Sequence, residues 1–213
     1  MRLIDMSVTE FSDIDSNSTA PGGGSVAALA SNIGIGLARM MAHLSFGKKK
    51  YEALDENIRL EFVDRFNKMA DIRKELMELI DKDTESFNEV MKAMKMPKET
   101  KEQIKLRKSA IQDATLFSIE VPFKTAKLSL KALELLKYLV EYGNQNAITD
   151  IGVGTLMLYT GLEGAILNVK VNLMELDNKE LHDSYSNSCK EILSNAKAIK
   201  DKLIQDIHIK LEN

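Results

Sequence analysis

Apolar residues recur at spacings of three and four along nearly the whole chain, which is the period of an α-helix. We find no run of alternating apolar and polar residues with the β-branched enrichment that is typical of a strand. Glycine and proline interrupt the pattern at few points, and only three prolines in 213 residues favour long helices. The pattern predicts an all-α protein with one domain over residues 1–213 and helices over residues 25–45, 52–95, 98–120, 122–141, 146–175 and 178–211.

The first of these helices is apolar on nearly all sides. It carries small residues at every fourth position, namely Ala30, Gly34, Ala38 and Ala42. Small side chains at this spacing allow a neighbouring backbone to approach closely. The run is almost long enough to span a bilayer, but Asn32, Arg39 and His43 inside it would be costly in lipid. A buried central helix explains the run better than a membrane span, and we expect no membrane partner.

The helix expected over residues 146–175 contains four glycines, each of which costs about 1 kcal/mol of stability relative to Ala. Helical geometry places six small or polar residues within about 80° of one another, namely Asp150, Gly154, Gly161, Gly164, Asn168 and Asn172. This face forms either a tight seam between two helices or the wall of a ligand cavity. The spacing alone favours the seam.

Composition removes several classes of function. Hydrophobic residues make up 44% of the chain and charged residues 29%, which is the balance of an ordinary globular protein. A net charge of −3 gives no basic field for nucleic acid. The single cysteine, Cys189, excludes a disulfide framework and fits a reducing compartment. The three histidines are scattered, so we expect no metal site. The first residues lack the apolar core of a signal peptide, so we expect a cytoplasmic protein.

One carboxylate on the longest predicted helix stands out from the other acidic residues. Asp83 falls on a continuous apolar stripe, between Ile80 and Phe87, whereas Asp81 and Glu85 fall on the outer side. A carboxylate in an apolar seam is costly to ionise, so its pKa should rise unless a cation pairs with it. That environment suits a general acid and base near neutral pH. The alternative is a structural role in a buried salt bridge or a helix cap.

Two further clusters are candidates for binding an anion. The first is the glycine-rich helix start formed by Gly22, Gly23, Gly24 and Ser25, where unpaired backbone N–H groups meet the positive end of a helix dipole. The second is the basic run formed by Lys48, Lys49, Lys50 and Tyr51, which would attract a polyanion. The structural alternatives are a flexible turn capped by Ser25 and a solvated charge cluster. The spacing of a P-loop is absent.

Six motifs occur in an order that is similar to the order of motifs in a known family. They are Pro21-Gly22-Gly23-Gly24-Ser25-Val26-Ala27-Ala28, Gly47-Lys48-Lys49-Lys50-Tyr51, Asp81-Lys82-Asp83-Thr84-Glu85-Ser86-Phe87, Val121-Pro122, Gly143-Asn144-x4-Thr149-Asp150 and Asn168-Val169-x-Val171-Asn172-Leu173. The sequence resembles the cyclodeaminase/cyclohydrolase family of folate enzymes over nearly its whole length, from about residue 5 to 205. Thr149 stands where the family often has Ser, which keeps the hydroxyl. The resemblance is to the free-standing form, without a formiminotransferase domain.

The resemblance implies a helical homodimer or larger homo-oligomer that acts on tetrahydrofolate, with no cofactor beyond this substrate. It gives the proton-transfer role to an Asp in the motif at 81–87, and the helical-face argument selects Asp83. Residues 22–25 and 48–51 would hold polar or anionic parts of the folate, including a polyglutamate tail. Asn144, Asp150 and Asn168 are then candidates for ordering the pterin ring.

Two activities fit this resemblance. A cyclodeaminase converts 5-formiminotetrahydrofolate to 5,10-methenyltetrahydrofolate and ammonia, and we favour it. A cyclohydrolase adds water to the same methenyl carbon and gives 10-formyltetrahydrofolate. A hypothesis of another class is a non-catalytic helical protein that binds folate or acts as a scaffold. Retention of Asp83, the glycine-rich helix start and the lysine run argues against that last hypothesis.

Overall fold

Long helices that lie roughly along one common axis form the protein. The computed structural model describes residues 2–13 and 20–212. The long helices are α2 (Gly23–His43), α4 (Glu56–Met94), α5 (Lys101–Tyr142), α6 (Ile148–Leu173) and α7 (Lys179–Glu212). Shorter elements are η1 (Leu3–Asp5), α1 (Val8–Ser12), α3 (Lys49–Glu52) and η2 (Gln145–Ala147). No strand occurs within these described ranges, so the predicted all-α class is confirmed.

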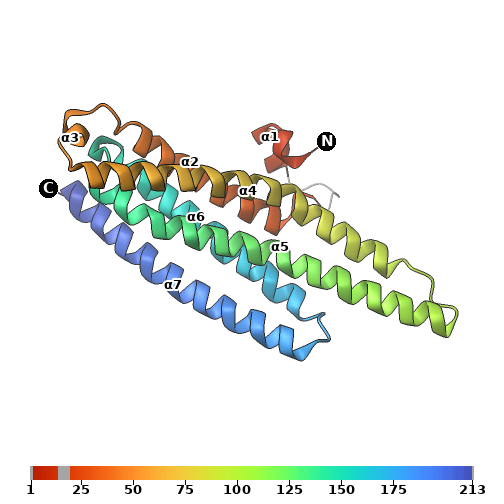
Figure 1. Ribbon diagram of the computed structural model, residues 1–213. Helices are drawn as coiled ribbons and strands as arrows, with labels where there is room; N and C mark the ends of the chain where they lie inside the picture. Colours follow the sequence, from red (N-terminus) through yellow and green to blue (C-terminus); the bar gives the residue numbers. More distant parts are fainter. Residues whose placement is uncertain (1, 14–19, 213) are drawn as a thin grey trace.

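The centre of the bundle is α2, which packs on α6, α4 and α5, while α7 covers α5 and α6. The hairpin of α4 and α5 extends beyond the other helices at one end, and α3 lies at the opposite end (Figure 1). Fully buried side chains from all four central helices meet in one core, including Ile35, Met41, Phe62, Met69, Leu76, Leu133, Leu136 and Leu158. The apolar stripe predicted on α4 therefore faces the core along most of its length.

Glycines make the contact between α2 and α6 very close. A Cβ placed on Gly34 would lie 2.6 Å from the carbonyl oxygen of Gly154, and one on Gly154 would lie 2.8 Å from the carbonyl oxygen of Gly34. Two turns further along the seam, a Cβ on Gly161 would lie 2.5 Å from the carbonyl oxygen of Ala27. These distances confirm a helix–helix seam at Gly154 and Gly161, whereas Asn168 and Asn172 at the end of the same face line a cavity. The two backbones touch, which no larger residue would permit.

Length and composition would allow α2 to cross a membrane, with a mean hydropathy of 1.3 in its most apolar 18-residue window. In the structure, 61% of that window is buried inside the bundle. Asn32 is 5% exposed, and its side-chain amide donates to the carbonyl oxygen of Arg73 at 2.9 Å. These are the features of a core helix, as the sequence predicted.

The prediction of two helices over 98–120 and 122–141 is wrong, because α5 continues through Pro122 without a break. A proline has no N–H, so the carbonyl oxygen four residues earlier, on Ser118, loses its helical donor. The side-chain amide of Asn172, on α6, donates to this oxygen at 2.6 Å. A partner on a neighbouring helix thus replaces the missing backbone hydrogen bond.

The segment before α2 contains two short elements that the hydrophobic pattern did not indicate. The α1 helix begins with a capping box, in which the Ser7 hydroxyl accepts from the Glu10 N–H and the Glu10 carboxylate accepts from the Ser7 N–H. Its Ser-x-x-Glu spacing is the sequence signal for this helix. Asp81 anchors the chain just before it, by accepting from the Leu3 N–H at 2.6 Å and pairing with Arg2.

Replacing Gly161 by Ala is expected to destabilise the protein by about 1–3 kcal/mol, because the new methyl group overpacks a backbone contact. The matched control is Gly36→Ala on α2, where a Cβ would meet nothing within 4 Å. That change should stabilise the helix by up to about 1 kcal/mol through helix propensity. Chemical denaturation of the two variants measures both effects. Equal free energies of unfolding would contradict the seam.

Removing the amide of Asn172 by substitution with Ala should cost about 1–3 kcal/mol, because the Ser118 carbonyl is then left without a donor. Pro122→Ala restores the backbone N–H that this carbonyl lacks. The Asn172→Ala cost should therefore be smaller in a Pro122→Ala background. A double-mutant cycle measured by denaturation gives the coupling energy, and a coupling of zero would refute the compensation.

Candidate functional site

A cavity of about 420 Å³ opens where the start of α2 meets α4, α5 and the end of α6. One wall is apolar and comes mainly from the projecting α4–α5 hairpin, and the facing wall carries short polar side chains. Its lining residues are Gly22, Gly23, Asp83, Thr84, Ser86, Phe87, Val90, Met94, Ile111, Thr115, Ser118, Asn168, Val171, Asn172 and Glu175. An apolar cavity with a few converging polar groups is typical of a small-molecule site. We call it the Asp83 cavity.

Asp83 is half-buried, and the first turn of α2 holds its carboxylate. Oδ2 accepts from the Ser25 backbone N–H at 2.9 Å and from the Ser25 hydroxyl at 3.0 Å. The same carboxylate lies so close to Gly24 that a Cβ there would stand 2.5 Å from the Asp83 Cγ. Glycine at position 24 is thus required for Asp83 to reach the helix start.

Electrostatics at Asp83 combine two opposing effects. Burial raises the pKa of the Asp83 carboxyl above its ordinary value, and the two hydrogen bonds from Ser25 oppose this rise. Among the described residues that line the cavity there is no Lys, Arg or His. The other ionisable group of the lining is Glu175, which is exposed. The cavity therefore favours a ligand that carries positive charge near Asp83.

The neighbouring Asp81 has a different role from Asp83. It faces the amino-terminal segment, where Leu3 and Arg2 occupy its carboxylate. The sequence argument selected Asp83 over Asp81 because only Asp83 falls on the apolar stripe. The structure places only Asp83 in the cavity, and its catalytic role stays a prediction.

The four residues of the glycine-rich helix start divide into two pairs. Gly22 and Gly23 line the cavity, as expected for substrate-binding residues. Gly24 and Ser25 lie behind them, and Ser25 is 0% exposed. The hydroxyl and the N–H of Ser25 both bond to Asp83, and substrate binding by Ser25 stays a prediction. Ser25 holds the carboxylate and does not line the cavity.

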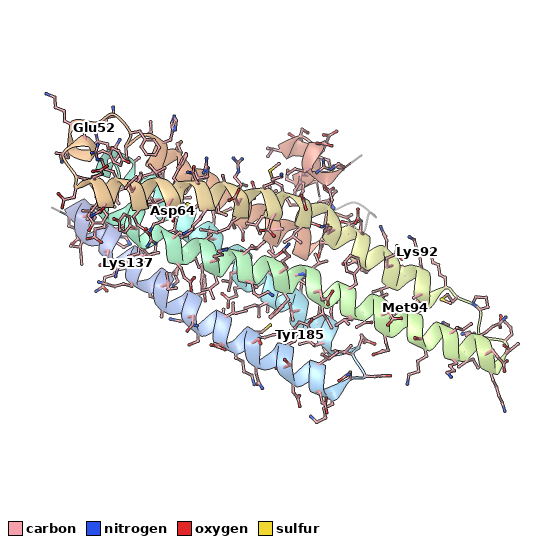
Figure 2. The ribbon with its side chains drawn as sticks, viewed as in Figure 1. Glu52, Asp64, Lys92, Met94, Lys137 and Tyr185 are labelled. Atoms are coloured by element: carbon pink, nitrogen blue, oxygen red, sulfur yellow. The ribbon has the colours of Figure 1, made fainter. Side chains whose placement is uncertain are left out.

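The lysine run lies in a separate cavity of about 230 Å³, at the other end of α2. This second cavity, which we call the lysine pocket, is lined by Ser45, Lys48, Lys49, Lys50, Tyr51, Tyr142, Gly143, Asn144, Gln145 and Asn146. The 21 residues of α2 span roughly 30 Å. In Figure 2, Met94 of the Asp83 cavity and Glu52, which follows the lysine run, lie toward opposite ends of the bundle. One chain does not bring the lysines to Asp83.

The three residues proposed to order the pterin also lie apart. Asn168 lines the Asp83 cavity, and its amide donates to the Gly164 carbonyl at 2.9 Å. Asn144 lines the lysine pocket, where its amide donates to the Leu44 carbonyl at 3.1 Å. Asp150 is half-buried in the first turn of α6 and lines neither cavity. Within one chain only Asn168 is therefore placed beside Asp83.

Several residues that line the cavity had not been singled out as site residues. The clearest are Thr84, Phe87, Ser118 and Asn172. Asn172 carried a usable signal, since it falls on the same face of α6 as Asn168. Ser118 carried none, because a serine within a long amphipathic helix is ordinary. Among the described residues, no group of three His, Cys, Asp or Glu side chains could hold a metal ion.

Comparisons with known proteins agree with one another. Residues 7–191 match the family model described as formiminotransferase-cyclodeaminase. A methenyltetrahydrofolate cyclohydrolase of Methylorubrum extorquens is 30% identical over 203 residues, which cover 95% of this chain and 96% of that protein. The formimidoyltransferase-cyclodeaminase of Dictyostelium discoideum is 36% identical over 204 residues, which cover 95% of this chain and 36% of that protein. This chain therefore spans about a third of the length of that bifunctional relative.

A solved structure extends the likeness to three dimensions. The crystal structure of formiminotetrahydrofolate cyclodeaminase from Thermotoga maritima matches with a TM-score of 0.77 and 25% identity, over 98% of this chain and 96% of that one. Sequence and fold thus agree along almost the whole length of the chain. The chain belongs to the formiminotransferase-cyclodeaminase family.

Proposed function

We propose that the protein closes the ring of 5-formiminotetrahydrofolate to give 5,10-methenyltetrahydrofolate and ammonia. The observation that carries this proposal is Asp83, a half-buried carboxylate in a cavity where the part of the lining that the structure describes contains no cationic side chain. The protonated formimino group is a cation, and so is the methenyl product. An ionised Asp83 offsets this positive charge in surroundings where water does little to screen it.

In this reaction Asp83 moves one proton between two nitrogens. N10 of the folate attacks the formimino carbon, which becomes tetrahedral between N5, N10 and the amino group. Asp83 takes the proton from N10 and delivers it to the amino group, which leaves as ammonia. The positive charge remains on the N5–C–N10 bridge, so charge and atoms balance. The reaction exchanges one C–N bond for another and needs only a proton-transfer group.

The neighbours of Asp83 support this chemistry. The N–H and hydroxyl of Ser25 both bond to Oδ2, and among the described residues no hydrogen bond is made to Oδ1. Oδ1 packs against Gly24, and in this proposal it is the oxygen that carries the transferred proton, because Oδ2 is held by Ser25. Gly23 and Asn168 border the same space, where an amide can bond to the edge of a pterin ring.

Cyclohydrolysis of 5,10-methenyltetrahydrofolate is the second candidate, because the Methylorubrum extorquens relative of nearly equal length carries that name. The named cyclodeaminase of Thermotoga maritima is also of nearly equal length. In cyclohydrolysis, water adds to the methenyl carbon and Asp83 takes one proton from it. The second proton of the water then moves to N5 as the C–N5 bond breaks, which gives 10-formyltetrahydrofolate, and Asp83 releases its proton to solvent. Both reactions pass through a tetrahedral carbon and place the same demand on Asp83.

Absorbance of the methenyl bridge distinguishes the candidates. Its appearance from 5-formiminotetrahydrofolate supports the cyclodeaminase, and its accelerated loss from methenyltetrahydrofolate supports the cyclohydrolase. In either assay Asp83→Asn should lower kcat by about 100- to 10,000-fold, the usual contribution of a general acid and base. Asp81→Asn is the control and should keep near-normal turnover. No turnover of either folate would favour a binding or scaffold protein instead.

Stability gives the folding control for Asp83→Asn. Because burial raises the pKa of Asp83 in the folded state, its ionised form costs stability at pH values above that raised pKa. Asp83→Asn removes this cost, so its melting temperature at neutral pH should match or exceed that of the parent protein. The advantage should shrink as the pH falls and Asp83 becomes protonated. A lower melting temperature at neutral pH would mean that lost activity reflects lost folding.

We also propose that the lysine pocket binds the glutamate tail of the folate. Within one chain it lies roughly 30 Å from the start of α2. A tail of several residues, or the Asp83 cavity of a second subunit in a homo-oligomer, would bring the two together. Exposed apolar residues on α2 and α6, among them Ile33, Met40, Val153 and Leu156, suit such an assembly.

Replacing Lys48, Lys49 and Lys50 by Gln should weaken a polyglutamylated folate several-fold more than the monoglutamate, and added salt should reduce the difference. The control replaces Lys197 and Lys202 of α7 by Gln. The side chain of each of these two lysines is 64% exposed. Calorimetric binding of both folates to each variant measures the effect. Equal losses for the two folates would remove the tail-binding role.

A further inference from the structure

The hydroxyl of Ser25 lies between two acceptors. Its Oγ stands 2.9 Å from the carbonyl oxygen of Ile80 and 3.0 Å from Oδ2 of Asp83. Both distances are those of good hydrogen bonds, whereas the Thr84 hydroxyl lies 3.5 Å from the same Oγ, at the outer limit for one. A serine hydroxyl has one proton, so it donates to one of these acceptors at a time. The side chain is 0% exposed, so water does not take the place of either acceptor.

The two acceptors suit the two protonation states of Asp83. When Asp83 is ionised, Oδ2 carries charge and is the stronger acceptor, so the hydroxyl donates to it. When a proton sits on Oδ1, the carboxyl is neutral and Oδ2 accepts more weakly. The hydroxyl then turns to the Ile80 carbonyl, and the Ser25 backbone N–H, 2.9 Å away, continues to hold Oδ2.

We propose that Ser25 is a positioning residue whose hydroxyl turns between Asp83 and the Ile80 carbonyl as Asp83 gains and loses its proton. This inference rests on the proposed proton-transfer function of Asp83. The transferred proton arrives on Oδ1 and leaves from Oδ1, and the Ser25 proton stays on its own oxygen. Asp83 can thus change charge twice in a turnover without leaving the buried hydroxyl unpaired, which would be costly.

Few other groups near Asp83 could produce the same effect. The α2 residues facing it are the uncharged Gly22, Gly23 and Gly24, and the α5 and α6 residues lining the cavity are uncharged as well. On α4, Asp81 faces Arg2, which pairs with it. Glu175 is the remaining ionisable group of the lining, and it is exposed. Ser25 supplies both hydrogen bonds that oppose the effect of burial on Asp83.

The test begins with the pH profile of kcat for Ser25→Ala. Losing one hydrogen bond to a carboxylate should raise the pH at which kcat falls on the acid side of the profile, the acid limb, by about one unit. Plateau kcat should fall, and KM should stay within about twofold, because Ser25 is fully buried and lies outside the cavity lining. Ser31→Ala is the matched control: Ser31 is another buried serine of α2, and its hydroxyl bonds to Ser129 at 2.7 Å. It should not move the acid limb.

A measurement without folate separates this inference from the proposed function. The pKa of the Asp83 carboxyl is followed by carbon-13 NMR, with the signal assigned by its absence in Asp83→Asn. A higher pKa in Ser25→Ala than in Ser31→Ala supports the role of Ser25 even if neither folate is turned over. An unchanged pKa together with an unchanged acid limb would overturn the inference, whatever the enzyme's activity.

The melting temperature of Ser25→Ala, measured as a function of pH, tests whether the Ser25 hydroxyl turns. If Ser25 bonds to Ile80 when Asp83 is protonated, Ser25→Ala should lower the melting temperature on both sides of the Asp83 titration. The loss should be larger on the alkaline side, where the bond to a charged group is also removed. A loss confined to the alkaline side would show that the hydroxyl serves only the ionised state, which would refute the two-state role.

Discussion

The close approach of α2 to α6 determines where the start of α2 lies, and the site depends on that position. At Gly34, Gly154 and Gly161 the backbones of the two helices are in contact. A larger residue at any of these positions would push the helices apart. The first turn of α2 would then move away from α4, and the two hydrogen bonds from Ser25 to Asp83 would be lost. Glycines inside helices cost stability, but here they allow the close approach of α2 to α6 that keeps the Asp83 carboxylate in place.

A second constraint acts from the opposite wall of the same cavity. Pro122 leaves the Ser118 carbonyl without a helical donor, and Asn172 supplies one from α6. Ser118 and Asn172 both line the cavity, so this substitute hydrogen bond ties α5 to α6 at the site itself. The shape of the Asp83 cavity therefore depends on a side-chain amide at its α5–α6 wall. At its α2 wall the shape depends on the backbone contact between α2 and α6.

Periodicity alone was sufficient to predict the all-α class, the central position of α2 and the fact that Asp83, and not Asp81, lies on the apolar side of α4. These features follow from local geometry, because the apolar stripe on α4 reports which side of the helix faces the core. The break expected at Pro122 was wrong because its compensation comes from α6, fifty residues away in sequence. No local pattern announces such a partner.

The same limit explains why the sequence did not show which of the predicted site residues lie together. Asn144 and the lysine run are separated from Asp83 by the length of α2, which motif order does not show. Ser25 was expected to bind substrate because helix starts commonly hold anions. In the structure the anion held there is the protein's own carboxylate, Asp83.

The described lining of the Asp83 cavity has acidic but no cationic side chains, which has a consequence for the design of inhibitors. A compound that presents a rigid, delocalised cation, such as a cyclic amidine, would gain the attraction of Asp83 without meeting a lysine or arginine of the lining. A compound that presents an acid at the same position would meet repulsion instead. Selective ligands should therefore carry their positive charge where they meet Asp83 and their acidic groups at a distance from it.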